Sequence, residues 1–288
     1  MKIFDKNACQ LGEGPLWHPK RKTLFWFDII EKKLFERSLE PNAKTVVRNF
    51  DVHVSAAGWI NEKTLLIASE QELFKLDLDT NSQEHIVSLE ANNPITRSND
   101  GRADPWGGFW IGTMGKNLEP EAGAIYRYYK GELRKLFNKI TISNAICFAP
   151  NKPIAYFCDT PERVIKQQKL DPSTGWPVDD PSIAINLSDT DLNPDGAVVD
   201  SEGCVWNAQY GAGRLARYTP NGMEEQVVLF HASQATCPAF GGPDLNILFA
   251  TSAADGLDLS TNENESAGQT FFKQMKLIGQ AEHQVILA

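Results

Sequence analysis

One pattern recurs six times along this chain. Each copy consists of a small residue, an alternating apolar stretch, a polar turn, and an apolar or aromatic run that ends on a small or acidic residue. The copies occupy residues 13–28, 57–69, 100–113, 144–159, 195–208 and 237–251, at a spacing of about 45 residues. Because a unit of this size cannot bury both of its faces alone, the repeat predicts units that pack side by side.

Each unit predicts four β-strands. The two runs of every copy are followed by a third strand-like piece, at residues 33–36, 72–76, 124–128, 163–166, 213–218 and 269–273. A fourth, more irregular apolar piece often follows, as at residues 45–50, 85–89, 133–137 and 227–230. β-Branched and aromatic residues fill these pieces, and Gly, Pro, Asn and Asp separate them. The pattern predicts an all-β fold, a six-bladed β-propeller, formed as a single domain over residues 1–288 around a central channel.

The alternative folds are a β-sandwich and two stacked barrels, neither of which requires a repeat. Residues 2–5 and 284–288 lie outside the six copies. We expect these two ends to pair within one blade, because that pairing would close the ring and remove exposed strand edges.

The charge of the chain argues against two classes of partner. The formal net charge is -9, and no run is rich in Lys and Arg. Nucleic acid and anionic membrane surfaces attract the opposite balance of charge, so we expect neither as a partner. The first residues lack the apolar segment of a signal peptide, which predicts a cytoplasmic protein. No long apolar stripe indicates an obligate dimer, so we expect a monomer or a weak homodimer.

The repeat also predicts a site. In a propeller the first strand of each blade lines the channel, so residues at the start of these strands form a ring. The residues just before the small residue of each copy are Glu13, Ala57, Asp100, Asn144, Asp195 and Cys237. Converging carboxylates repel one another and lose hydration, and a divalent cation compensates for both costs.

Oxygen ligands without histidine favour Ca²⁺, Mg²⁺ or Mn²⁺ for this predicted channel site. The sequence does not exclude Zn²⁺ or Fe²⁺. The alternative is that the Glu-Gly, Asp-Gly and Asn-Ala pairs are only turns at strand starts.

Several motifs carry a resemblance to a known family. They include GEGPLW at 12–17, RSNDG at 97–101, ISN at 142–144 and PDG at 194–196, and further matching segments extend from residue 11 to residue 253. In these segments and their order, the chain resembles the gluconolactonase, regucalcin and senescence-marker-protein-30 family of six-bladed propellers.

The resemblance implies a metal-dependent hydrolase that opens a sugar lactone, an aldonolactone, to the aldonic acid. Family members hold one divalent metal ion with the Glu of the first motif, the Asn of ISN and the Asp of PDG. These residues fall on Glu13, Asn144 and Asp195. The metal would act as a Lewis acid, and Asp195 as the general acid/base.

Substrate contacts are implied for Arg97 and Asn99, the Arg and first Asn of RSNDG. We add Asp100, a second possible proton acceptor, and Asn117, which stands where some members carry a substrate-contacting Glu. The alternative for Arg97 is a buried ion pair with Asp100. The family's glycine after ISN is Ala145 here, a change expected to matter little if φ is negative.

Two other functions fit the same residues. The ring could bind Ca²⁺ in a regulatory scaffold that has no lactonase activity, or the chain could be an esterase of phosphotriesters or other lactones. Arg97 and Asn99 favour the lactonase over the scaffold, because a structural metal site has no need of them.

Overall fold

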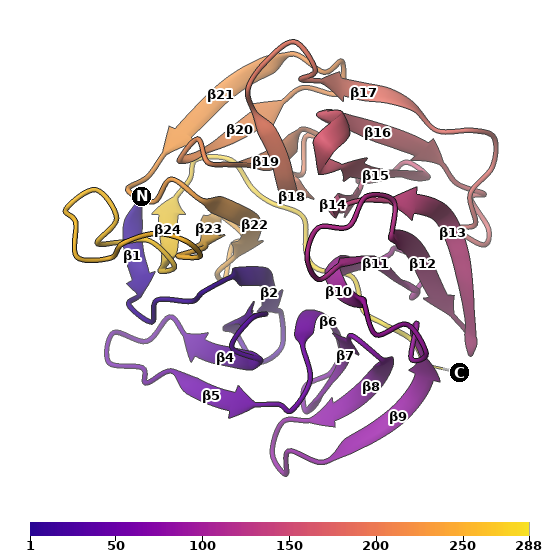
Figure 1. The fold of residues 1–288 in the computed structure, drawn as a ribbon, viewed down its shortest axis with the longest axis horizontal. Helices are drawn as coiled ribbons and strands as arrows, with labels where there is room; N and C mark the ends of the chain where they lie inside the picture. Colours follow the sequence, from indigo (N-terminus) through magenta and orange to yellow (C-terminus); the bar gives the residue numbers. More distant parts are fainter. Residues whose placement is uncertain (288) are drawn as a thin grey trace.

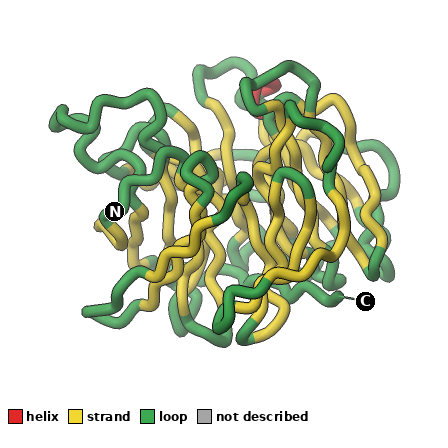
Figure 2. The backbone as a smooth tube through the Cα atoms, turned by 60° about the horizontal axis from the view of Figure 1, so that its bottom comes forward, coloured by secondary structure: helices red, strands yellow, loops and turns green. Residues whose placement is uncertain are grey.

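The computed structural model describes residues 1–287 and folds them into six four-stranded antiparallel sheets. The sheets stand like blades around a central axis, and, apart from β1, the chain passes through them in sequence order (Figure 1). Figure 2 shows the strands running between two ends of the ring, where the loops gather, with the short 3-10 helix η1 (Thr160–Glu162) at one end. Within residues 1–287, no helix is long and apolar enough to cross a membrane. The predicted six-bladed β-propeller is confirmed.

The first strand of each predicted copy is the innermost strand of a blade. These strands are β2 (Gly12–His18), β6 (Val54–Asn61), β10 (Thr96–Ala103), β14 (Ser143–Phe148), β18 (Asn193–Val199) and β22 (Ala235–Gly241). Each contacts the innermost strands of the two neighbouring blades, so these six strands surround the axis.

The other strands follow outward in order. The second strands are β3 (Thr23–Asp28), β7 (Thr64–Ser69), β11 (Phe109–Gly115), β15 (Ile154–Asp159), β19 (Val205–Tyr210) and β23 (Ile247–Ser252). The third strands are β4 (Lys33–Ser38), β8 (Glu72–Asp77), β12 (Gly123–Tyr129), β16 (Val164–Lys169), β20 (Arg214–Tyr218) and β24 (Thr270–Gln274). The outermost strands are β5 (Val46–Asn49), β9 (Gln83–Ser88), β13 (Glu132–Ile140), β17 (Ser182–Asn186), β21 (Glu224–Leu229) and β1 (Lys2–Asp5).

Inter-blade packing explains the continuous aromatic run of β3. Successive side chains of a strand point to opposite faces of the sheet. Phe25 and Phe27 pack in one cluster with Ile67 of the following blade, whereas Trp26 packs in another with Phe249 of the preceding blade. All three aromatic side chains of β3 are fully buried. A strand covered on both faces therefore needs apolar residues at every position, not at every second one.

The N-terminal strand closes the ring. β1 pairs with β24, the third strand of the last blade, through Lys2 opposite Phe272 and Ile3 opposite Phe271. The predicted pairing of residues 2–5 with residues 284–288 is therefore wrong, and Ala288 lies outside the described residues. The free edge of β24 accepts one partner strand, and β1 occupies it.

The C-terminal segment takes a different path, across the turns that follow the innermost strands (yellow in Figure 1). Val285 donates its backbone N–H to the carbonyl of Trp59 at 2.9 Å. Glu282 turns inward and forms a buried ion pair with Arg102 of β10. Residues 275–287 thus link several blades without forming a strand, and Glu282 brings a paired charge into the interior of the ring.

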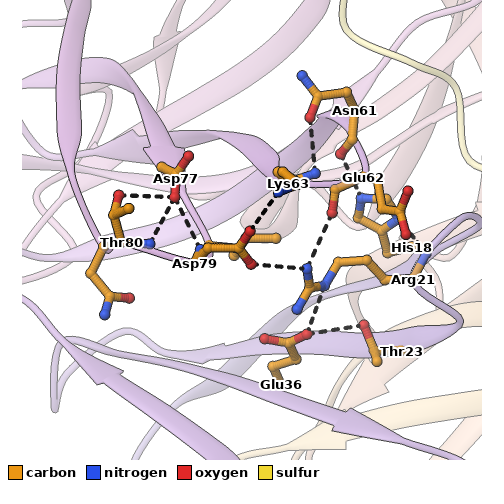
Figure 3. Close-up of polar contacts among 12 residues, drawn as sticks. His18, Arg21, Thr23, Glu36, Asn61, Glu62, Lys63, Asp77, Asp79 and Thr80 are labelled. Carbon is orange, nitrogen blue, oxygen red and sulfur yellow. Dashed lines mark hydrogen bonds and ion pairs between the residues drawn. The ribbon is translucent and has the colours of Figure 1, made fainter.

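His18 fastens the turn between β2 and β3 to the next blade (Figure 3). Its Nδ1 accepts hydrogen bonds from the backbone N–H groups of Lys20 and Arg21, at 3.3 and 3.2 Å. Its Nε2 lies 2.9 Å from the carbonyl oxygen of Asn61, to which it donates. Since Nδ1 can accept only without a proton, this imidazole is neutral. Burial lowers the pKa of His18, which agrees with that assignment.

We expect the wild-type protein to lose stability on acidification more steeply than a His18→Asn variant. The pKa of His18 is lowered by folding, so its stabilising effect is complete above about pH 6.5 and is lost as the pH falls below that value. Asparagine retains an acceptor oxygen but gains no charge. Urea unfolding at pH 7.5 and 5.5 checks this prediction, and an equal loss in both proteins would contradict it.

Candidate active site

Register irregularities mark the innermost strands where the ring was predicted. They fall between Glu13 and Leu16, Ser98 and Gly101, Asn144 and Cys147, Pro194 and Ala197, Ala235 and Pro238, and, in the second blade, between Val54 and Ala56. A bulge opposes two residues of one strand to one of its partner and re-aims the side chains. The repeated position is therefore the place where an inner-strand side chain leaves the regular alternation.

A cavity of about 1000 Å³ opens at the end of the ring where η1 lies. Its volume is in the range of small-molecule sites. The residues that line it are Leu11, Glu13, Ile30, Arg97, Asn99, Met114, Lys116, Asn117, Leu118, Ile142, Asn144, Thr160, Pro161, Glu162, Arg163, Ser188, Asn193, Asp195, Tyr210 and Asp255.

The structure brings Glu13 of β2, Asn144 of β14 and Asp195 of β18 to this one cavity. They come from three separate blades, and their exposed fractions are 5%, 3% and 7%. Three polar side chains are thus nearly removed from water but still border a space that a ligand can enter.

Burial raises the pKa of both carboxyl groups in this set. The pKa of Glu13 rises to about 8, chiefly by desolvation and then by the charge of Asp100. Desolvation and the charge of Glu13 raise the pKa of Asp195 well above its ordinary value. Their ionised forms are therefore costly unless a positive charge lies nearby. Arg97 contributes part of that charge, and burial lowers its own pKa to about 10.

Arg97 borders the cavity without a carboxylate partner. Its Nη1 donates to the carbonyl of Ser98 at 2.9 Å and to Oδ1 of Asn99 at 2.8 Å. No carboxylate within residues 1–287 forms an ion pair with it. The alternative of an ion pair with Asp100 is therefore not what the structure shows, and the remaining N–H groups of Arg97 are available to a ligand.

Asp100 does not line the cavity. Its Oδ2 accepts a hydrogen bond from the backbone N–H of Ile146, in the neighbouring blade, at 2.7 Å. The bulge between Ser98 and Gly101 turns Asn99, not Asp100, toward the cavity. Burial raises the pKa of Asp100 to about 6. The structure thus places one oxygen of Asp100 in a blade-to-blade contact behind the cavity, close enough to Glu13 for the charge of Asp100 to act on that carboxyl group.

The family model for the SMP-30/Gluconolactonase/LRE-like region matches residues 11–254. This stretch covers most of the chain and includes all four quoted motifs. The chain belongs to this family. Its homologues include sugar lactone lactonases and regucalcins.

Three relatives show how far the likeness extends in this family. A protein of Rhizobium meliloti (strain 1021), described as a candidate sugar lactone lactonase, is 39% identical over 285 residues, 98% of this chain and 95% of its own length. The L-arabinolactonase of Azospirillum brasilense is 32% identical over 277 residues, 94% of this chain and 90% of its own. The crystal structure of a calcium-binding protein, regucalcin, from Agrobacterium tumefaciens (strain C58) has a TM-score of 0.96 at 37% identity and covers 99% of this chain and 97% of its own.

Two carboxylates hold the loops that lead into β2 and β14, the strands that carry Glu13 and Asn144. Asp28 and Asp159 each close the second run of a copy. Asp28 accepts hydrogen bonds from the backbone N–H groups of Gln10 and Leu11, at 2.8 and 3.2 Å. Asp159 accepts them from the backbone N–H groups of Thr141 and Ile142, at 2.9 and 2.8 Å. Each aspartate is the last residue of its repeat copy, and the sequence pattern alone predicts no role for either. The recurrence of an acidic residue at this place was the signal that could have found them.

Asn117 lines the cavity from the loop after β11. Its Nδ2 donates to Oε1 of Glu119 at 3.1 Å, so the two side chains are linked within this loop.

Ala145 has a φ of 57°, in the left-handed region, so the expectation based on a negative φ does not hold. A non-glycine residue adopts this conformation at a cost of about 1–2 kcal/mol.

The candidate metal ligands at the cavity are oxygen atoms. Within residues 1–287, no group of three or more His, Cys, Asp or Glu side chains could hold a metal ion. Glu13, Asn144 and Asp195 instead combine two carboxyl groups with one amide, a set typical of hard cations.

Proposed function

We propose that this chain is a metal-dependent hydrolase that opens a sugar lactone to the aldonic acid. The observation that carries the proposal is the meeting of two buried carboxyl groups, an amide oxygen and an unpaired guanidinium at one cavity. The sugar lactonases among its homologues support the class of reaction.

The residues present fit one divalent cation. Glu13 and Asp195 are buried carboxyl groups whose ionised forms need a counter-charge, and Asn144 adds a neutral oxygen ligand. We assign these three side chains to hold the ion, which would be Ca²⁺, Mg²⁺ or Mn²⁺ by the preference of hard cations for oxygen. A cation bound there supplies Lewis-acid polarisation of the lactone carbonyl.

Arg97 and Asn99 orient the lactone. Both hydrogen bonds of the Arg97 guanidinium come from Nη1, which leaves Nε and Nη2 to donate to substrate oxygens. A guanidinium only donates, so it selects the carbonyl and hydroxyl oxygens of a polyhydroxylated ring. Asn99 is held beside it by Arg97 on one side and Asn144 on the other.

Asp195 moves the proton. As water adds to the lactone carbonyl carbon, its carboxylate takes one proton from that water. When the bond between the carbonyl carbon and the ring oxygen breaks, the same proton passes to the departing alkoxide. The products are one carboxylic acid and one hydroxyl group, and no covalent enzyme intermediate is needed.

Proton release measured with a pH indicator tests the proposal. Metal-stripped protein is reloaded with Ca²⁺, Mg²⁺, Mn²⁺, Zn²⁺ or Fe²⁺ and offered pentono-, hexono- and acidic sugar lactones, with aryl esters and phosphotriesters as a comparison. We expect a metal-restored rate at least ten times the spontaneous rate for some sugar lactones. Folded, metal-bound protein with no rate above background on any of them would contradict the proposal and favour a calcium-binding scaffold. Faster turnover of aryl esters would favour the esterase.

A further inference from the structure

A chain of four hydrogen bonds crosses three blades beside the cavity. Its members are Arg97 and Asn99 of β10, Asn144 of β14, Thr160 of η1, and the carbonyl of Pro194 in β18. The bonds run from Arg97 Nη1 to Asn99 Oδ1 (2.8 Å), from Asn99 Nδ2 to Asn144 Oδ1 (3.1 Å), from Asn144 Nδ2 to Thr160 Oγ1 (2.9 Å) and from Thr160 Oγ1 to Pro194 O (2.8 Å).

The two ends of this chain fix its direction. A guanidinium can only donate, and a backbone carbonyl can only accept. If the Asn144 amide were turned by half a rotation, its NH₂ group would face the NH₂ group of Asn99. Its oxygen would then face a hydroxyl whose proton is already given to Pro194. Each amide between the ends therefore has one satisfied orientation.

Thr160 is itself held by backbone bonds. Its N–H donates to the carbonyl of Ile142 at 3.0 Å, and its own carbonyl accepts from the N–H of Arg163 at 3.0 Å. It directly follows Asp159, which grips the loop that leads to Asn144. The hydroxyl is thus presented to Asn144 from a fixed piece of backbone.

We propose that Thr160 is a positioning residue that sets the orientation of the Asn144 amide. By accepting from Nδ2, its hydroxyl leaves Oδ1 as the atom that Asn144 offers as a ligand. Asn99 takes one lone pair of that oxygen, and the second stays for a cation. This inference rests on the proposed function, because it gives Asn144 the role of a metal ligand.

The test compares Thr160→Val, which keeps the shape but removes the hydroxyl, with Thr160→Ser, which keeps the hydroxyl. Isothermal titration of Ca²⁺ and of Mn²⁺ into metal-stripped protein measures the Kd. We expect Thr160→Val to bind about 10- to 100-fold more weakly, as for other losses of a residue that orients a ligand, and Thr160→Ser to stay within about threefold of wild type. Should the valine variant not fold, Thr160→Ala gives the same comparison.

Thr113→Val is the matched control. Thr113 is a buried threonine whose hydroxyl makes two hydrogen bonds to the backbone of Ala124, at 2.9 and 3.3 Å, and none to the chain of bonds described above. The Kd of Thr113→Val for the metal measures the general effect of removing a buried threonine hydroxyl. We expect this Kd to match that of the wild type.

Equal metal affinity in Thr160→Val and wild type would overturn the role of Thr160 and leave the proposed function intact. A Thr113→Val variant that loses as much affinity as Thr160→Val would also overturn it. Wild-type protein that binds none of the metals would overturn both the inference and the metal-dependent function.

Discussion

Replacing Asp195 with asparagine is expected to lower kcat for lactone hydrolysis by about 10² to 10⁴, the usual contribution of a general acid/base. The amide oxygen of asparagine can still serve as a ligand, but an amide does not accept a proton from water at neutral pH. The fold should persist, because Asn207 donates to the backbone carbonyl of Asp195 and not to its side chain. The measurement is kcat on the best lactone, with metal content and circular dichroism determined on the same sample.

Asp189→Asn is the matched control for this prediction. Asp189 lies six residues before Asp195 and is exposed to solvent. The same chemical change there should leave kcat unchanged. An Asp195→Asn variant that keeps the wild-type kcat with metal bound would show that another group moves the proton.

Replacing Asp104 with alanine is expected to lower the free energy of unfolding by about 3 to 5 kcal/mol. The Asp104 carboxylate accepts from Nε of Arg127 at 2.6 Å, and both side chains are 0% exposed. It also accepts from the backbone N–H groups of Trp106 and Gly108, each at 2.9 Å. Alanine would leave a buried guanidinium charge without its partner and two turn N–H groups without an acceptor. Urea unfolding followed by tryptophan fluorescence measures the change.

Asp79→Ala provides the comparison for a surface charge. Asp79 pairs with Lys63 at 3.1 Å and with Arg21 at 3.8 Å, and its side chain is 48% exposed (Figure 3). Exposed pairs of this kind contribute less than about 1 kcal/mol. A loss below 1 kcal/mol for Asp104→Ala as well would show that the rest of the Arg127 environment, including Tyr129 and Trp176, compensates for the missing carboxylate.

The ends of the chain show where sequence reasoning fails. The repeat predicts that a strand outside the copies must close the ring, and β1 does so. Which strand edge it meets depends on where the long connection after β23 returns, and no local pattern encodes that path. Residues 284–288 are predicted to pair with residues 2–5, but Val285 is instead buried beside Trp59, to whose carbonyl its N–H donates.

The site shows the same division between local and long-range information. Register along the repeat predicts that Glu13, Asn144 and Asp195 lie on equivalent parts of three blades, and the structure brings them to one cavity. The same register along the repeat also includes Asp100. In the structure, however, the bulge in β10 directs the Asp100 carboxylate to the backbone N–H of Ile146 in the next blade. A bulge moves side chains by one residue of register, and a sequence pattern of small and polar residues does not resolve a shift of that size.

The sequence by itself determined the number of blades and the three inner strands of each blade, because these follow from a periodicity that every copy repeats. Only the tertiary structure decided which polar side chains meet, which of them are held by backbone N–H groups and how each amide is turned. Those outcomes depend on contacts between residues such as Asn144 and Thr160, or Arg102 and Glu282, that belong to different strands or distant segments. A hydrogen bond or an ion pair is decided within a few tenths of an ångström, and the sequence carries no distance between segments that only folding brings together.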